Sequence, residues 1–321
     1  VQFPPPPPVF FLGCPPHNQG MSLVALVACL TLQSPLVPVA RVEHPPIDEM
    51  SGIVKSRRWA GVYWVHNDSG DQARVFAIRA DGSAVMPGQQ NRKEDAGKVE
   101  PVPPEFPGLA INQAVNTDWE DIAYDGQNLY LADVGNNNNA RRDLAVYVVS
   151  EPNPFDARSA TPTTRYPVAY LDQADFPPAG DKPFDCEAVF ARGGNLYFLT
   201  KHRSPVGMPV GATNLYVLSL RSARADRVNV LRKVASLQGL PGWVTAADVS
   251  DDGRRLAILM QAPGQAVWTF DLEGPESGWL RKPSAKVEFS GARQCEAICW
   301  DGPDTVRITN EQRDVFTLRV G

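Results

Sequence analysis

Short apolar runs recur along the chain after Arg41, and residues that favour turns separate them. Runs of about five to seven residues suit β-strands and are too short for the helices of a bundle. The 30 prolines and 25 glycines fit many strands joined by turns. The pattern predicts an all-β protein.

Five segments resemble one another, and each begins a set of expected strands. The first strands are expected at Glu49–Ile53, Glu120–Tyr124, Glu187–Phe190, Ala247–Ser250 and Glu296–Trp300. Second strands are expected at Gly61–Val65, Asn128–Ala132, Asn195–Leu199, Arg255–Leu259 and Thr305–Ile308. Third strands are expected at Arg74–Ile78, Leu144–Val149, Asn214–Leu220, Ala266–Phe270 and Asp314–Leu318. Fourth strands are expected at Leu109–Val115, Thr164–Tyr170, Val228–Ala235 and Ala285–Phe289.

These segments begin 49 to 71 residues apart, which is enough for a four-stranded antiparallel blade with variable loops. The spacing predicts a five-bladed β-propeller. Since the fifth set ends after its third strand, we expect the stretch Leu36–Val42 to supply the last strand and close the ring. A six-bladed ring is the alternative. The extra length falls in Pro-rich insertions without enough strand signal, at Met86–Pro107, Glu151–Pro162 and Phe176–Phe184.

The first 40 residues differ in composition from the rest of the chain. They contain 9 of the 30 prolines and no Asp, Glu, Lys or Arg. The apolar stretch Ser22–Leu32, after a candidate start at Met21, is typical of an export signal and too short to cross a bilayer. We therefore expect residues 1–35 to be a leader, 36–321 a single propeller domain, and the protein to be periplasmic or secreted. Cys29 ends a lipobox-like sequence, so a lipoprotein is the alternative.

The charge balance limits the classes of partner. The formal net charge is −5, with no basic surface suited to nucleic acid, so we expect none to bind. No segment of the body is long and apolar enough for a membrane helix. We expect a monomer that binds a small-molecule substrate or ligand at one mouth of the channel.

In a propeller, the starts of first strands and the ends of second strands share one face. Glu49, Glu120, Glu187 and Glu296 stand at such starts, and Asn67 and Asn310 at such ends. Converging carboxylates repel one another unless a cation neutralises them. All-oxygen ligands in an irregular ring favour Ca²⁺ over Mg²⁺, and no Cys or His spacing suits zinc. The alternative is structural: each carboxylate accepts backbone N–H bonds from the neighbouring blade.

Other polar residues at the same positions are candidates for catalysis. Lys201, His202 and Arg203 end one second strand and are expected to stabilise developing negative charge. Asp68 and Asp121 are candidate general bases. The stretch Asp133–Asn139 has the composition of a calcium loop but lacks its ligand spacing and terminal Glu, so we expect a polar turn.

Several of these runs resemble a known group of proteins. Met50-Ser51-Gly52-Ile53, Tyr63–Gly70, Asp118–Ala123, Leu129–Gly135 and Glu151-Pro152 look like exported bacterial TolB-like propeller proteins, some of them labelled esterase-like phytase. The resemblance is best over residues 45–155. The Glu-led strands are similar, more distantly, to calcium-dependent apyrases and gluconolactonase-type propellers. That likeness implies a cation among Glu49, Glu120, Glu187 and Glu296, with Ala247 in place of a fifth Glu.

Three functions follow as hypotheses. The first is a metal-dependent hydrolase of a small phosphorylated or ester substrate. The second is a non-catalytic module that binds a ligand or protein at the same mouth. The third is a glycosidase that uses two carboxylates across the channel.

Overall fold

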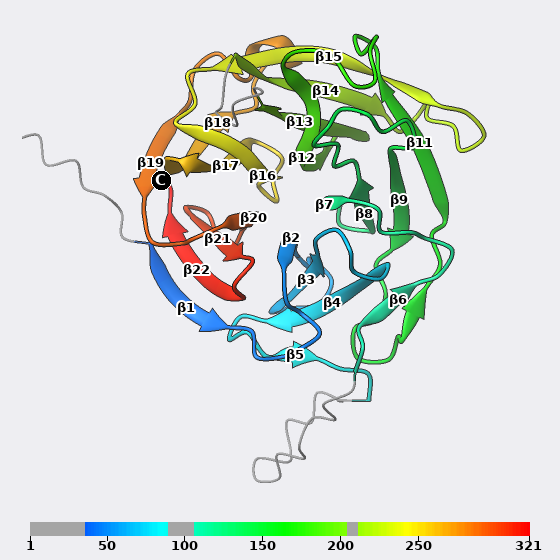
Figure 1. The fold of residues 1–321 in the computed structure, drawn as a ribbon. Helices are drawn as coiled ribbons and strands as arrows, with labels where there is room; N and C mark the ends of the chain where they lie inside the picture. The colour runs from blue at the N-terminus through cyan, green and yellow to red at the C-terminus, as the bar shows by residue number, and fades with distance from the viewer. Residues whose placement is uncertain (1–35, 89–105, 204–210) are drawn as a thin grey trace, which may run out of the picture. The chain divides into compact units, whose positions relative to one another are not determined.

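The computed structural model describes residues 36–88, 106–203 and 211–321. The chain divides into two units, Val1–Leu32 and Gln33–Gly321, and all described residues belong to the second. The predicted leader, residues 1–35, and its Cys29 lie outside the described residues. The described part is all-β and propeller-like, as predicted (Figure 1), with one short 3-10 helix, η1 (Glu276–Gly278), and no α-helix. No described helix has the length and apolar character needed to cross a membrane.

Five inner strands stand around the centre of this unit, one from each repeat of the sequence (Figure 1). They are β2 (Met50–Lys55), β7 (Trp119–Tyr124), β12 (Lys182–Arg192), β16 (Gly242–Val249) and β20 (Cys295–Trp300). Each inner strand contacts the next one in chain order, and β20 contacts β2. The circle of inner strands is therefore closed.

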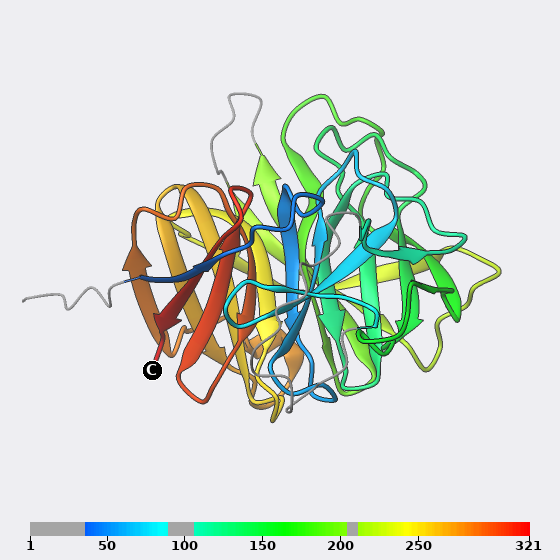
Figure 2. The same cartoon turned by 90° about the horizontal axis from the view of Figure 1, so that it is seen from below.

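Antiparallel pairing continues outward from each inner strand through a second and a third strand. The second strands are β3 (Val62–Asn67), β8 (Asn128–Asp133), β13 (Asn195–Arg203), β17 (Arg255–Pro263) and β21 (Thr305–Asn310). The third strands are β4 (Arg74–Arg79), β9 (Ala145–Ser150), β14 (Ala212–Ser219), β18 (Gln265–Asp271) and β22 (Asp314–Arg319). Seen from the side, the strands run from one face of the unit to the other (Figure 2).

The outer strands differ from sheet to sheet. They are β6 (Leu109–Ile111), β11 (Thr164–Tyr170), β15 (Asn229–Gln238), β19 (Ala285–Phe289) and β1 (Val37–Arg41). The N-terminal β1 pairs antiparallel with β22 and so completes the sheet of the last three strands. Because β11 pairs antiparallel with β9 and then parallel with β15, two four-stranded sets form one eight-stranded sheet. Short strands β5 (Ala84–Val85) and β10 (Ser159–Ala160) pair with β4 and β6.

Five hydrophobic clusters fill the spaces between successive sets of strands. Trp64 of β3 and Trp119 of β7, for example, belong to the same cluster and are buried. Inner strands are packed on both faces, and all six residues of β7 are buried. Outer strands such as β19 alternate between exposed and partly buried residues, because one face meets solvent. The packing holds the inner strands at fixed positions around the centre.

Candidate functional site

Each inner strand contains a β-bulge, at which its pairing with the second strand slips by one residue. The bulge residues are Ser51, Glu120, Glu187, Thr245 and Glu296. A bulge leaves one residue unpaired and redirects its side chain, and bulges are frequent beside functional sites. The hydroxyls of Ser51 and Thr245 donate to a backbone carbonyl of the next inner strand, 2.9 Å away in both cases. The three glutamates, together with Ser51, line a common pocket.

That pocket has a volume of about 350 Å³ and lies at the starts of inner strands and the ends of second strands. It is lined by Ser51, Asp68, Ser69, Asp118, Glu120, Asn137, Glu187, Lys201, Arg203, Trp243, Gln261, Ala262, Gln294, Glu296 and Glu311. Six of these residues are acidic and two are basic. Among the residues predicted as site residues, Asp68, Glu120, Glu187, Lys201, Arg203 and Glu296 are therefore brought together.

One side of the pocket is purely acidic. Asp68, Asp118 and Glu120 each present an oxygen within 4.8 Å of the other two. Glu120 is only 7% exposed, and its carboxylate has no hydrogen bond or ion pair with any described residue. Burial, together with Glu187 and the other nearby carboxylates, raises the pKa of Glu120 well above its usual value. Burial and the neighbouring Asp68 raise the pKa of Asp118 to about 6.

Gly135 lies against the carboxyl groups of Glu120 and Asp118. It follows β8, and its backbone N–H donates to the carbonyl of Asp118 at 3.1 Å. A methyl group on Gly135 would overlap the carboxyl groups of Glu120 and Asp118. Only glycine lets the backbone approach these carboxylates so closely.

The other side of the pocket holds two cations, each already paired. Lys201 Nζ lies 2.9 Å from Glu187 Oε2, and Arg203 Nε lies 2.9 Å from Asp185 Oδ2. Burial by itself lowers the pKa of Lys201, but the nearby Glu187 and other carboxylates outweigh it and raise that pKa. Asp185, Glu187 and Glu120 form a second group of oxygens within 4.8 Å of one another. Lys201 and Arg203 pair with Glu187 and Asp185 of this second group, whereas Asp68, Asp118 and Glu120 have no cationic partner among the described residues.

Two further carboxylates complete the lining. Gln261 Nε2 donates to Glu296 Oε1, and Gln294 Nε2 donates to Glu311 Oε1 at 2.8 Å. Burial raises the pKa of Glu296 to about 8, with Lys201 opposing the rise. Glu296 is therefore a carboxyl group that holds a proton near neutral pH.

Three of the predicted metal ligands do not line the pocket. Glu49 is exposed just before β2, and its place is taken by Ser51 at the bulge. The side chain of Asn67 donates to the Pro46 carbonyl and to Asp71, both at 2.8 Å. Asn310 is the third. Its Nδ2 donates to the Ala292 carbonyl at 2.9 Å, and its Oδ1 accepts the backbone N–H of Asp314 at 2.8 Å. The amides of Asn67 and Asn310 are thus occupied by residues outside the pocket lining.

Asp121 also lies away from the pocket lining. It is fully buried, and its two oxygens accept backbone N–H bonds from Ile122 and from Val189 of the next inner strand, both at 2.8 Å. Asp248 makes the same type of link to Val249 and Trp300. The structural alternative considered for the glutamates is thus realised by these aspartates.

His202 faces a neighbouring cavity of about 200 Å³, which shares Trp243 with the acidic pocket. Its Nδ1 lies 3.1 Å from the Ala212 carbonyl, and its Nε2 lies 3.6 Å from Asp181 Oδ2. His202 is therefore next to the pocket but does not line it.

Asp118 and Asp185 were not predicted as site residues. Each stands two positions before a bulge glutamate, in Asp118-Trp119-Glu120 and Asp185-Cys186-Glu187. Gln294 has the same spacing to Glu296. This repeated polar-x-Glu pattern is the sequence signal that identifies them.

Comparisons with known proteins identify no family. A scan against protein-family models finds no match, and a search of curated proteins finds none either. Among solved structures, one similar chain is a structural genomics protein of unknown function from Bacteroides thetaiotaomicron VPI-5482. The two chains share 12% identity with a TM-score of 0.41, over 89% of this chain and 76% of that one.

Proposed function

We propose that the chain is a metal-dependent hydrolase of a small ester or phosphorylated substrate, with Ca²⁺ bound by Asp68, Asp118 and Glu120. The observation that carries the proposal is the buried Glu120 carboxylate, which faces other carboxylates and has no cationic partner among the described residues. Such a group either keeps a proton or binds a cation.

The donor set suits a hard cation. Ca²⁺ binds oxygens at about 2.3–2.6 Å, so two oxygens on one ion are at most about 5 Å apart. The oxygens of Asp68, Asp118 and Glu120 lie within 4.8 Å of one another, which fits that limit. Gly135 leaves these carboxylates room to converge. A bound cation would polarise a substrate oxygen and lower the pKa of water.

The residues opposite the acidic group support a hydrolytic reaction. Lys201 and Arg203 can donate hydrogen bonds to an oxygen on which negative charge develops. Glu296, with a pKa of about 8, holds a proton near neutral pH and is suited to give it to a leaving group. Asp121 has no part in this proposal, because backbone N–H groups occupy both of its oxygens.

The charge of the pocket bears on the substrate class. The six acidic lining residues and the adjoining Asp185 outnumber the two cations, and one Ca²⁺ offsets only part of the difference. A substrate that carries an uncharged ester meets less repulsion there than a multiply charged phosphate. We therefore place esters ahead of phosphate esters.

The remaining parts of the interpretation are proposals as well. Five inner strands in a closed circle support a five-bladed propeller, in which the eight-stranded sheet counts as two blades and β1 completes the last blade. We propose that the protein is related to exported TolB-like propeller proteins and is periplasmic or secreted, as the runs quoted above and the leader composition suggest.

The test combines Ca²⁺ titration by calorimetry with an activity screen on nitrophenyl esters, lactones and phosphate esters. In Glu120→Gln we expect Ca²⁺ binding and turnover to be lost, and the melting temperature in EDTA to rise, because the folded chain no longer has to protonate a carboxylate, or bury an ionised one, at this position. Glu288→Gln, a change of an exposed residue on β19, is the matched control. Absence of Ca²⁺ binding to the wild type would refute the metal site. Binding without turnover of any substrate would favour a non-catalytic ligand-binding module.

A further inference from the structure

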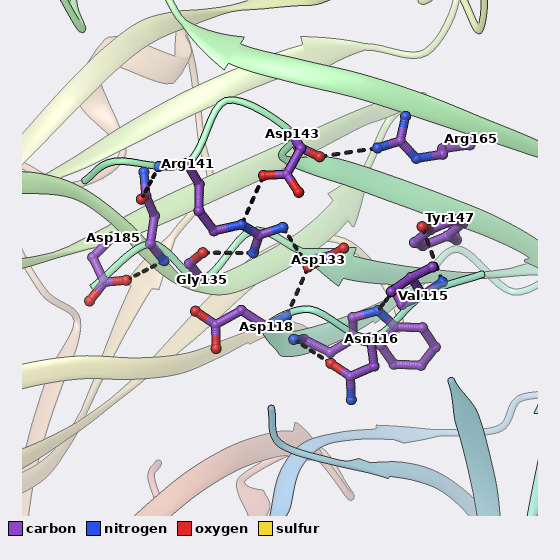
Figure 3. A network of polar contacts seen from close by, with 12 residues as sticks. Val115, Asn116, Asp118, Asp133, Gly135, Arg141, Asp143, Tyr147, Arg165 and Asp185 are labelled. Atoms are coloured by element: carbon purple, nitrogen blue, oxygen red, sulfur yellow. Dashed lines mark hydrogen bonds and ion pairs between the residues drawn. The ribbon is translucent and has the colours of Figure 1, made fainter. Parts of the chain in front are cut away.

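Arg141 lies outside the pocket, in the loop between β8 and β9, and its guanidinium holds three groups (Figure 3). Its N–H groups donate to the Gly135 carbonyl at 2.8 Å, to Asp133 Oδ1 at 2.9 Å and to Asp143 Oδ1 at 3.1 Å. The arginine side chain is 16% exposed and that of Asp133 is 3% exposed. These contacts fix the course of the chain directly after β8.

Two of the residues that Arg141 contacts, Asp133 and Gly135, also form hydrogen bonds with the backbone of the pocket residue Asp118. Asp133 Oδ1 accepts the backbone N–H of Asp118 at 3.0 Å, and Gly135 N–H donates to the Asp118 carbonyl at 3.1 Å. The backbone N–H of Asn136, the next residue, donates to Asp185 Oδ1 at 2.8 Å. Gly135 itself lies against the carboxyl groups of Glu120 and Asp118. The loop thus contacts both groups of clustered carboxylates.

We propose that Arg141 is a positioning residue for the cation site. It acts through the Asp133–Asn136 loop, which holds Asp118 and Glu120 close enough to share one ion. This inference rests on the proposed function, since it takes Asp118 and Glu120 as ligands. The planar guanidinium meets the Gly135 carbonyl and two carboxylates in fixed directions, which a lysine ammonium cannot reproduce.

Outer-shell partners of metal ligands typically change metal affinity by about 10- to 100-fold when they are altered. The experiment is calorimetric titration of the whole chain with Ca²⁺ alone. Arg141→Lys keeps the charge and loses the geometry, and we expect its Kd to rise by about 10- to 100-fold. In Gly135→Ala the added methyl group would overlap the carboxyl groups of Glu120 and Asp118. We expect its Kd to rise at least as much as that of Arg141→Lys. Because Gly135 has no left-handed backbone angle, this second change acts through space alone.

Two controls separate positioning from general stability. Gly180→Ala adds a methyl group where nothing lies within 4 Å. Arg165→Gln removes the neighbouring arginine, which donates to the Asp143 carbonyl at 3.0 Å and lies over the Tyr147 ring but makes no contact with the Asp133–Asn136 loop (Figure 3). Both are expected to leave the Kd unchanged. Melting in EDTA reports the stability of each variant separately from its Ca²⁺ affinity.

The outcomes are distinct. Wild-type binding of Ca²⁺ with unchanged Kd values in folded Arg141→Lys and Gly135→Ala would overturn this inference and leave the proposed function standing. If Arg141→Lys does not fold, the Kd of Gly135→Ala decides whether the loop positions the carboxylates. If the wild-type chain binds no Ca²⁺, the proposed function and this inference are both overturned.

Discussion

Replacing Asp121 with asparagine is expected to destabilise the fold without acting on the pocket. Among the described strands, the inner strand β7 pairs only with β8, so its other edge has no ladder partner there. Asp121 accepts the N–H of Ile122 on its own strand and that of Val189 on β12, both at 2.8 Å. The carboxyl group therefore replaces sheet pairing between two neighbouring inner strands.

The expected loss of unfolding free energy follows from the number of hydrogen-bond acceptors that each substitution removes. Burial raises the pKa of Asp121 well above its usual value, but with or without a proton the group keeps two oxygens that accept hydrogen bonds. Asparagine has one such oxygen and turns an amide N–H₂ towards the second backbone donor. One buried N–H left without an acceptor costs about 1–3 kcal/mol. Alanine leaves two such donors and is expected to cost about 2–6 kcal/mol.

Equilibrium unfolding in urea measures this change. Asp251→Asn is the matched control, because its side chain is 72% exposed and its one ion pair with a described residue is with Arg57 at the surface. The expected loss is therefore below about 1 kcal/mol. If Asp121→Asn unfolds with the wild-type free energy, the carboxyl group does not hold the two strands together. If it also abolishes turnover, Asp121 is the general base that the sequence first suggested.

Three further predictions concern charge, closure and the amide residues. The folded-state pKa values of Asp118 (about 6) and Glu296 (about 8) exceed their ordinary values. The Ca²⁺-free protein is therefore expected to lose stability from about pH 4 to 8 in urea unfolding, and saturating Ca²⁺ is expected to reduce this loss. A stability that does not change with pH in EDTA would contradict this. Deleting residues 1–41 removes β1, which pairs with β22, and is expected to lower the melting temperature relative to deletion of residues 1–35. Equal melting temperatures of the two deletion variants would show that β1 adds no stability. Asn310→Ala is expected to cost about 1–3 kcal/mol in urea unfolding and to leave the calorimetric Kd for Ca²⁺ unchanged; a weaker Kd would restore Asn310 as a ligand.

The strands were largely predictable from the sequence. The outer strands at Thr164–Tyr170 and Ala285–Phe289 have the predicted bounds, because turn residues flank each apolar run. β13 was predicted to end at Leu199 and continues to Arg203. Polar residues at its end remain in the ladder. The pattern of apolar residues could not reveal this, since the side chains of Lys201 and Arg203 line the pocket and not the core.

The candidate site was predictable only in part, because the sequence does not show where the β-bulges fall. A bulge is a one-residue slip in backbone pairing, so composition does not show which residue it redirects. Counting from the repeats placed Glu49 in the ring, whereas the ladder places Ser51 there.

The bulges also explain why the acidic charge is uneven around the centre. Ser51 and Thr245 turn their hydroxyls to the backbone of the next inner strand. The neighbouring strands β7 and β12 instead each bring an aspartate and a bulge glutamate, Asp118 with Glu120 and Asp185 with Glu187. Because these two strands touch, Glu120 belongs to both groups of carboxylates. Lys201 and Arg203 extend from β13, the partner of β12, so their positive charges lie beside Glu187 and Asp185 and not beside Asp68, Asp118 and Glu120.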